Sequence, residues 1–185
     1  MHEEIVAEAQ RKMETSLNSV REELARIRTG KATTALLDTV KVTAYGSTVP
    51  LKQVAGISVP EPRLILVQPW DPSIVGEIEK ALLKSDLGVT PSSDGKVIRL
   101  PIPPLTEERR KDLVRLVKKL AEEGRIAIRN VRREANDQLK AFERDGKVSE
   151  DAMHRAQKEV QDATDDYVQK VDEVLESKEH EIMEV

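Results

Sequence analysis

Residues 106–143 carry apolar side chains at helical spacing for about ten turns, and this pattern constrains the fold more than any other feature of the sequence. A helix of that length has to bury its apolar stripe against other helices. The predicted stripe consists of Leu113, Leu116, Leu120, Ala127, Val131 and Ala135. The sequence therefore predicts a long helical layer.

Two further segments repeat this spacing. The first, residues 2–28, has a stripe of Ile5, Ala9, Met13, Leu17, Val20, Leu24 and Ile27. The second follows Asp145-Gly146, with Ser149 as its expected N-cap, and its stripe is Met153, Ala156, Val160, Ala163, Tyr167, Val171, Val174 and Ile182. Because a short turn joins the last two helices, we predict an elongated antiparallel three-helix bundle.

The segment between the first two helices has a different pattern. β-rich runs at residues 40–45, 54–59, 63–67 and 97–100 are separated by glycine and proline, and a short amphipathic helix is expected at residues 73–84. We expect Tyr45 and Trp70 to lie in the core of this segment. The predicted fold class is α+β with two domains, in which a small β/α/β domain is inserted after the first helix.

The insertion sets the expected domain borders. The bundle comprises residues 1–30 and 105–185, and the inserted domain comprises residues 31–104. The two connections, near residues 29–32 and 101–105, are predicted to be hinges, with Gly30 and Lys31 in one and Pro103 and Pro104 in the other.

The charges are distributed unevenly along the chain. The net charge is −4, yet residues 106–148 hold 13 basic and 9 acidic side chains, whereas residues 149–185 hold 4 and 12. At about 100° per residue, six cations of the second helix gather within about a third of its circumference. These cations and the adjacent Arg133 are here called the basic strip: Lys111, Arg115, Lys118, Arg125, Arg129, Arg132 and Arg133. Guanidinium groups pair well with phosphate, so the strip is either a polyanion-binding surface or an ordinary solvated helix face.

The acidic third helix also has two interpretations, a partner surface or a solubilising face. We favour the second, and we expect its carboxylates to offset the basic strip and to reduce indiscriminate binding of polyanions. If so, binding to bulk RNA should change when four of these carboxylates are neutralised, namely Asp165, Asp166, Asp172 and Glu173.

Four segments, in this order, resemble the bacterial ribosome recycling factor family, also called ribosome-releasing factors. They are Arg26-Ile27-Arg28-Thr29-Gly30, Ser85-Asp86-Leu87-Gly88, Pro103-Pro104-Leu105-Thr106-Glu107-Glu108-Arg109-Arg110-Lys111-Asp112-Leu113 and Ile128-Arg129-Asn130-Val131-Arg132-Arg133. The sequence departs from the family pattern at Lys31, where arginine is usual, and at Thr33-Thr34, which replaces a stretch that often contains proline.

The resemblance implies an L-shaped protein that binds between the ribosomal subunits after peptide release. There it acts with the GTPase elongation factor G to separate the subunits, so that mRNA and deacylated tRNA leave. It also implies contacts to large-subunit ribosomal RNA, mainly through the bundle. The positions that match the family's basic contact set are Arg28, Arg110, Arg129, Arg132 and Arg133, with Arg132 the most strongly implicated. We expect Arg125, which lies on the same basic strip, to bind the ribosome together with these five.

The residue inventory argues against catalysis. The sequence has no cysteine, and its three histidines, His2, His154 and His180, have no nucleophile at a partner spacing. It contains no phosphate-binding loop and no apolar run near the ~20 residues that cross a bilayer. We therefore expect no enzyme activity, no cofactor, no metal site and no membrane partner, but a cytoplasmic monomer. The alternative function is a helical scaffold or adaptor that leaves one apolar seam open for another chain.

Overall fold

The computed structural model describes residues 1–85 and 87–184, and its chain divides into two compact units. The first unit comprises Met1–Arg28 and Glu107–Val185, and the second comprises Thr29–Thr106. Within the described residues, no helix is both long and apolar enough to cross a membrane.

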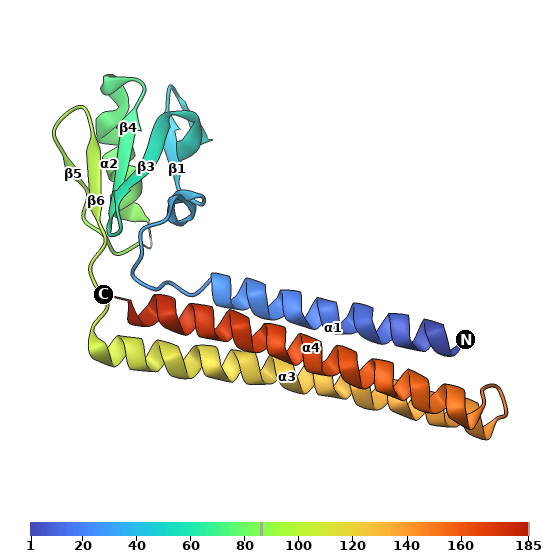
Figure 1. Cartoon of the computed structure of the whole chain (residues 1–185). Helices are drawn as coiled ribbons and strands as arrows, with labels where there is room; N and C mark the ends of the chain where they lie inside the picture. Colours follow the sequence, from blue (N-terminus) through green and yellow to red (C-terminus); the bar gives the residue numbers. More distant parts are fainter. Residues whose placement is uncertain (86, 185) are drawn as a thin grey trace. The chain divides into compact units, whose positions relative to one another are not determined.

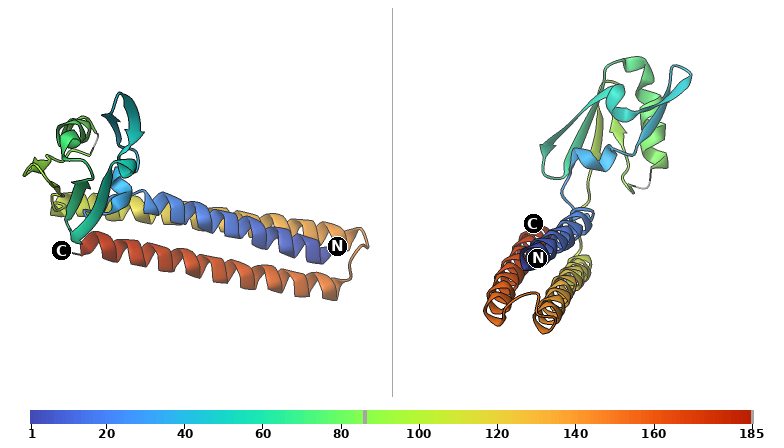
Figure 2. Two further views of the ribbon diagram at one scale, coloured as in Figure 1. Left: turned by 90° about the horizontal axis from the view of Figure 1, so that it is seen from above. Right: turned by 90° about the vertical axis from the view of Figure 1, so that its right-hand side faces the viewer.

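The first unit is the predicted antiparallel three-helix bundle. Its helices are α1 (His2–Ala25), α3 (Glu107–Arg144) and α4 (Glu150–Met183). Figure 1 shows α3 antiparallel to both α1 and α4, and the end-on view in Figure 2 shows each helix beside the other two. Helix α1 ends three residues earlier than predicted, because the amide of Ile27 donates to the carbonyl of Leu24 and closes a tighter last turn.

The apolar stripes of α1 and α4 are largely as predicted. In α1, Met13, Leu17 and Leu24 are fully buried, and only Ile27, which follows the helix, is half-buried. In α4 the predicted Ala163, Tyr167 and Val174 are half-buried, and Thr164 joins the core. Each of the three helices buries its seam inside the bundle, so the open seam expected of an adaptor is not seen among the described residues.

The predicted stripe of α3 was wrong in its direction. Leu113 and Ala135 are buried, but Leu116 is exposed, and Leu120, Ala127 and Val131 are only half-buried. The residues buried in place of these four are Val117, Ala121, Gly124, Ile128 and Leu139. The prediction placed the core diametrically opposite the arginines, whereas α3 packs against two helices and its buried face reaches to the edge of the basic strip.

The turn between α3 and α4 is the one predicted. Gly146 has φ +72°, and the amide of Lys147 donates to the carbonyl of Phe142 at 2.9 Å, which satisfies a carbonyl at the end of α3. Ser149 then caps α4, its hydroxyl accepting from the amide of Ala152 at 3.1 Å. These two local signals fix the reversal that brings α3 and α4 side by side.

The second unit contains two small antiparallel sheets. Strands β1 (Lys41–Ala44) and β2 (Ser47–Pro50) form a hairpin, and a four-stranded sheet has the order β3-β4-β6-β5. Its strands are β3 (Ala55–Glu61), β4 (Leu64–Pro69), β5 (Ser92–Ser93) and β6 (Ile98–Pro101). The four predicted strands are confirmed, while the short β2 and β5 were missed because neither has an alternating apolar pattern.

A helix covers this core. The predicted helix is α2 (Val75–Lys84), preceded by the single turn η3 (Pro72–Ile74), and it packs against β1. Two further single turns, η1 (Thr34–Leu37) and η2 (Leu51–Gln53), precede β1 and β3. The largest fully buried side chains are Leu37, Leu51, Ile65, Ile78, Leu82, Ile98 and Leu100.

The two chain connections of the second unit are tied to the turn between β3 and β4. The amide of Ala32 donates to the carbonyl of Pro62 at 2.8 Å, and the amide of Ile102 donates to the carbonyl of Arg63 at 2.7 Å. Gly30 has φ +81°, and a Cβ atom on it would lie 3.2 Å from Cγ of Leu105. The entering and leaving segments therefore run next to each other at the base of this unit.

The prediction that Tyr45 and Trp70 lie in the core was wrong. The two residues are 72% and 67% exposed. Tyr45 and Gly46 form the two-residue loop of the β1–β2 hairpin, both with positive φ, which turns the tyrosine ring outward, and its hydroxyl donates to Asp71. Of the predicted helix stop at Ser85–Gly88, Gly88 has the expected left-handed backbone, while Asp86 lies outside the described residues.

Candidate nucleic-acid interface

The basic strip lies along the edge of α3 that borders α4. Three of its cations, Lys118, Arg125 and Arg132, are seven residues apart, which places them on the same side of the helix. On α4, Glu179, Asp172 and Asp165 have the same spacing. Because α3 and α4 are antiparallel, the two series run in opposite order. Lys118 lies opposite Glu179, Arg125 opposite Asp172, and Arg132 is the counterpart of Asp165. These three pairs are here called the rungs of a ladder.

The rungs of this ladder differ in strength. Nζ of Lys118 lies 4.0 Å from Oε1 of Glu179, too far for a hydrogen bond. Arg125 lies 2.6 Å from Asp172 through Nη2. Arg132 has no carboxylate partner among the described residues, and its Nη1 donates to the neutral amide Oε1 of Gln161 at 3.3 Å. Charge compensation is therefore strong at the middle rung and weak at the other two.

Arg125 has most of its hydrogen-bonding capacity engaged. Its Nε also donates to Oδ1 of Asp172 at 2.7 Å, and its Nη1 donates to Oε2 of Glu122 at 3.0 Å. Only 17% of the side chain is exposed. Partial burial alone would lower the pKa of Arg125, but the hydrogen bonds to Asp172 and Glu122 outweigh it and raise that pKa. Arg125 therefore links α3 to α4 through Asp172.

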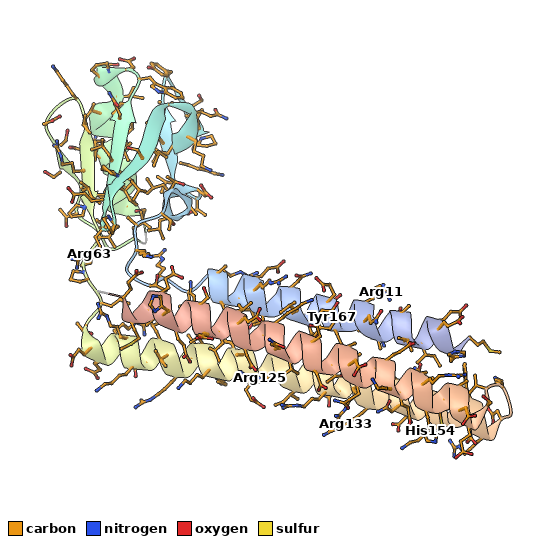
Figure 3. The ribbon with its side chains drawn as sticks, in the orientation of Figure 1. Arg11, Arg63, Arg125, Arg133, His154 and Tyr167 are labelled. Carbon is orange, nitrogen blue, oxygen red and sulfur yellow. The ribbon has the colours of Figure 1, made fainter. Side chains whose placement is uncertain are left out.

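The next arginines along the strip are progressively less compensated. Nη1 of Arg129 lies 3.5 Å from the other oxygen of Glu122, and its side chain is 42% exposed. Beyond it, Arg132 meets the amide of Gln161, whose Nε2 donates to Asp165 at 2.9 Å. Figure 3 labels Arg125 and Arg133 along α3. Arg133 is exposed and has no ion pair within residues 1–85 and 87–184.

The remaining predicted residues lie near the ends of the helices. Arg28, the last residue before the second unit, is exposed. Arg110, in the first turn of α3, is half-buried, and its Nε has no hydrogen-bond partner among the described residues. Pro103 and Pro104 are exposed, as is Lys31, which has an interaction partner. Arg110 precedes Arg125 by 15 residues of α3, about 22 Å along the helix axis, so it lies apart from the arginines of residues 125–133.

Two site residues were missed by the sequence analysis. Gln161 is a neutral side chain that carries no charge signal, and its role depends on the neighbouring helix. Glu122 was visible only as an acidic residue inside the strip, although it bridges Arg125 and Arg129 through its two oxygens. The seven-residue spacing of Asp165, Asp172 and Glu179 is the signal that, with an antiparallel pairing assumed, predicts the ladder.

Comparison with known proteins decides the family. The family model described as "Ribosome recycling factor" matches residues 20–183. The chain belongs to the ribosome recycling factor family. A ribosome-recycling factor from Shouchella clausii is 54% identical over 185 residues, and one from Desulforamulus reducens is 53% identical over 185 residues. Each comparison covers 100% of both chains.

Solved structures of the family agree with this assignment. A solution structure of a ribosome recycling factor is 44% identical, with a TM-score of 0.74, and the match covers 100% of this chain and 98% of that one. A model of the T. thermophilus factor is 48% identical, with a TM-score of 0.62 and full coverage of both chains. That factor is described together with E. coli elongation factor G, bound to the E. coli post-termination complex. Members of this family are translation factors.

Proposed function

We propose that this protein binds the post-termination ribosome at the subunit interface and, with the GTPase elongation factor G, splits it into subunits. Release of mRNA and deacylated tRNA then allows a new round of initiation. The observation that carries the proposal is the full-length match to ribosome recycling factors, one of which is described with elongation factor G on a post-termination complex.

Of the six predicted ribosome-binding residues, the proposed RNA contacts are Arg28, Arg110, Arg129, Arg132 and Arg133. Arg125, which was predicted with them, is set apart because its guanidinium group is engaged by Asp172 and Glu122. The graded compensation along α3 supports this choice at residues 129–133, because a cation without a carboxylate partner gains most from a phosphate. Contacts to phosphate and ribose suit a chain with one Trp, two Tyr and one Phe, since few aromatic rings are present to stack on bases. Ribosomal RNA of the large subunit is the proposed ligand.

The proposed mechanism is mechanical. The bundle, as the anchoring domain, transmits force because three packed helices resist bending, while the two connections to the second unit act as hinges. The hydrogen bonds of Ala32 and Ile102 fix these two residues to the second unit. We therefore place the hinges before Ala32 and after Ile102. The hinge residues are Gly30, Lys31, Pro103 and Pro104. Hydrolysis of GTP by the partner supplies the energy, and this protein itself catalyses no reaction. It acts as a monomer in the cytoplasm, where ribosomes work.

Co-sedimentation with vacant ribosomes tests the anchoring step. We expect wild type to pellet, increasing salt to release it, and Arg132→Ala to remain in the supernatant. The control is Arg155→Ala, which removes an exposed arginine of α4 outside the strip and should pellet like wild type. Circular dichroism should show both variants folded, because Arg155 is exposed and Arg132, which is half-buried, makes one hydrogen bond to a neutral amide, and such surface side chains usually contribute little to stability.

If wild type stays in the supernatant at low salt, or if Arg132→Ala and Arg155→Ala behave alike, the strip is not the ribosome anchor. Light scattering of ribosomes with elongation factor G and GTP then measures splitting directly, and absence of splitting by wild type would contradict the proposed function.

A further inference from the structure

Arg125 differs from the other arginines of the basic strip in how its side chain is used. Its Nε and Nη2 both point to Oδ1 of Asp172, and its Nη1 points to Glu122. The Nε–Nη2 edge of a guanidinium is one of the faces that grips a carboxylate or phosphate with two parallel bonds. In Arg125 this face is already occupied by a carboxylate of the neighbouring helix.

The ion pair with Asp172 makes Arg125 a poorer binding site for phosphate. A phosphate that approaches Arg125 has to displace Asp172, and the displaced carboxylate then lies beside the phosphate with the same sign of charge. Asp172 is 54% exposed, so its negative charge faces the approaching ligand rather than being hidden in the core. By contrast, a phosphate at Arg132 displaces only the neutral Gln161 amide.

We propose that Asp172 withholds Arg125 from RNA phosphate, so that α4 limits the binding of the basic strip to RNA in general. The proposal rests on the proposed function, in which Arg129, Arg132 and Arg133 of the strip contact ribosomal RNA. Arg129, Arg132 and Arg133 form the available part of the strip, and Arg125 with Asp172 forms a specificity-determining pair. A structured ribosomal site that presents phosphates to residues 129–133 is bound, while RNA that would need Arg125 as well is disfavoured.

The chain offers a matched control for Asp172. Asp166 lies on the same helix, is 62% exposed and forms an ion pair with Lys170 of α4 itself at 3.3 Å. Replacing either aspartate by alanine removes one negative charge and one ion pair. Only Asp172→Ala releases a cation of α3, because Asp166 has its partner on its own helix.

The experiment measures binding of the full chain to a 20-base-pair RNA duplex of arbitrary sequence across a salt series. Asp172→Ala should bind the duplex roughly fivefold more tightly, the equivalent of one net hydrogen bond. Its salt slope should steepen by about 0.9, the value expected for one further neutralised phosphate of a duplex. Asp166→Ala should show a smaller gain and the slope of wild type.

A double-mutant cycle identifies the released cation. Arg125→Ala alone should change duplex binding little, whereas Arg125→Ala combined with Asp172→Ala should abolish the gain and the extra slope. If Arg125→Ala melts at a lower temperature, Arg125→Gln, which keeps part of the aliphatic stem, replaces it in the cycle. Vacant ribosomes provide the second readout, since the ratio of ribosome affinity to duplex affinity should fall in Asp172→Ala.

Two outcomes would overturn the inference, and they are distinguishable. If wild type binds with normal salt dependence but Asp172→Ala matches Asp166→Ala, or if the gain survives in the double variant, Asp172 does not withhold Arg125. If wild type shows no salt dependence on either the duplex or the ribosome, the phosphate anchor itself is wrong and the inference falls with it.

Discussion

The bundle and the second unit reach their folds by different routes. In the bundle, local helical spacing predicted every helix, but which face is buried and which arginine is engaged depend on the neighbouring helix. In the second unit, turn geometry dominates, and a two-residue hairpin loop turned Tyr45 outward against its apolar character. In both units, therefore, the neighbouring element decides which side chains are buried or engaged, and the residue type alone does not predict it.

Replacing one glycine by alanine in each unit should show the largest difference between them, measured as the change in the free energy of unfolding. Gly124 of α3 lies against α1, where an added Cβ would come within 2.3 Å of Cγ2 of Val20. Gly124→Ala should therefore lower the free energy of unfolding by about 2 kcal/mol, because overpacking outweighs the gain of about 1 kcal/mol in helix propensity. Thermal or urea unfolding followed by circular dichroism measures the loss.

A glycine-to-alanine substitution in the second unit should change the free energy of unfolding in the opposite direction. Gly76 of α2 is exposed, and an added Cβ would meet no described atom within 4 Å outside the backbone of its own helix, so Gly76→Ala should stabilise by up to about 1 kcal/mol. Val20→Ala in the Gly124→Ala background should recover part of the lost stability. Equal effects of the two glycine variants would show that the close approach of α1 and α3 is not what selects Gly124.

A change at Gly30 tests the proposed hinge. Proline requires φ near −65°, whereas Gly30 has φ +81°, so Gly30→Pro should alter and stiffen this connection at a cost of about 1–3 kcal/mol. We expect ribosome splitting to fall more than ribosome binding, measured by light scattering and co-sedimentation. Gly30→Asn, which tolerates the left-handed region, should stay close to wild type in both assays. Parallel loss of splitting and binding in Gly30→Pro would contradict a hinge role.

The smallest expected effect concerns the acid sensitivity of the second unit. The hydroxyl of Tyr45 and the amide of Ser73 donate to Asp71, and these hydrogen bonds lower the pKa of its carboxyl. A lowered folded-state pKa contributes stability above the unfolded value of about 3.9, and this contribution is lost as the pH falls through the folded-state pKa.

NMR titration of Asp71 checks this linkage. In Tyr45→Phe the pKa of Asp71 should rise toward its ordinary value, because the larger of its hydrogen-bond contributions is removed. Asp71→Asn should flatten the corresponding part of the stability curve in acid. An unchanged Asp71 pKa in Tyr45→Phe would show that the tyrosine contact does not persist in solution.

The predicted site was partly visible in the sequence. The basic strip and its arginines follow from helical spacing and charge alone, whereas Arg28 and Arg110 came from resemblance to the family. The engagement of Arg125 by Asp172 was not predicted, since these residues are far apart in the chain and meet only through the antiparallel pairing of α3 and α4. Gln161 gave no signal, because a neutral amide on a charged helix resembles any other surface residue.

The sequence alone determined the three long helices, the α+β class and the turn at Gly146, because helical periodicity, strand composition and glycine backbone freedom act over a few neighbouring residues. Only the tertiary structure decided the buried face of α3, the close approach at Gly124 and the division of the strip into engaged and available arginines. Each of these depends on atoms supplied by another helix, and the free energy of a charge or a methyl group is set by the groups that surround it.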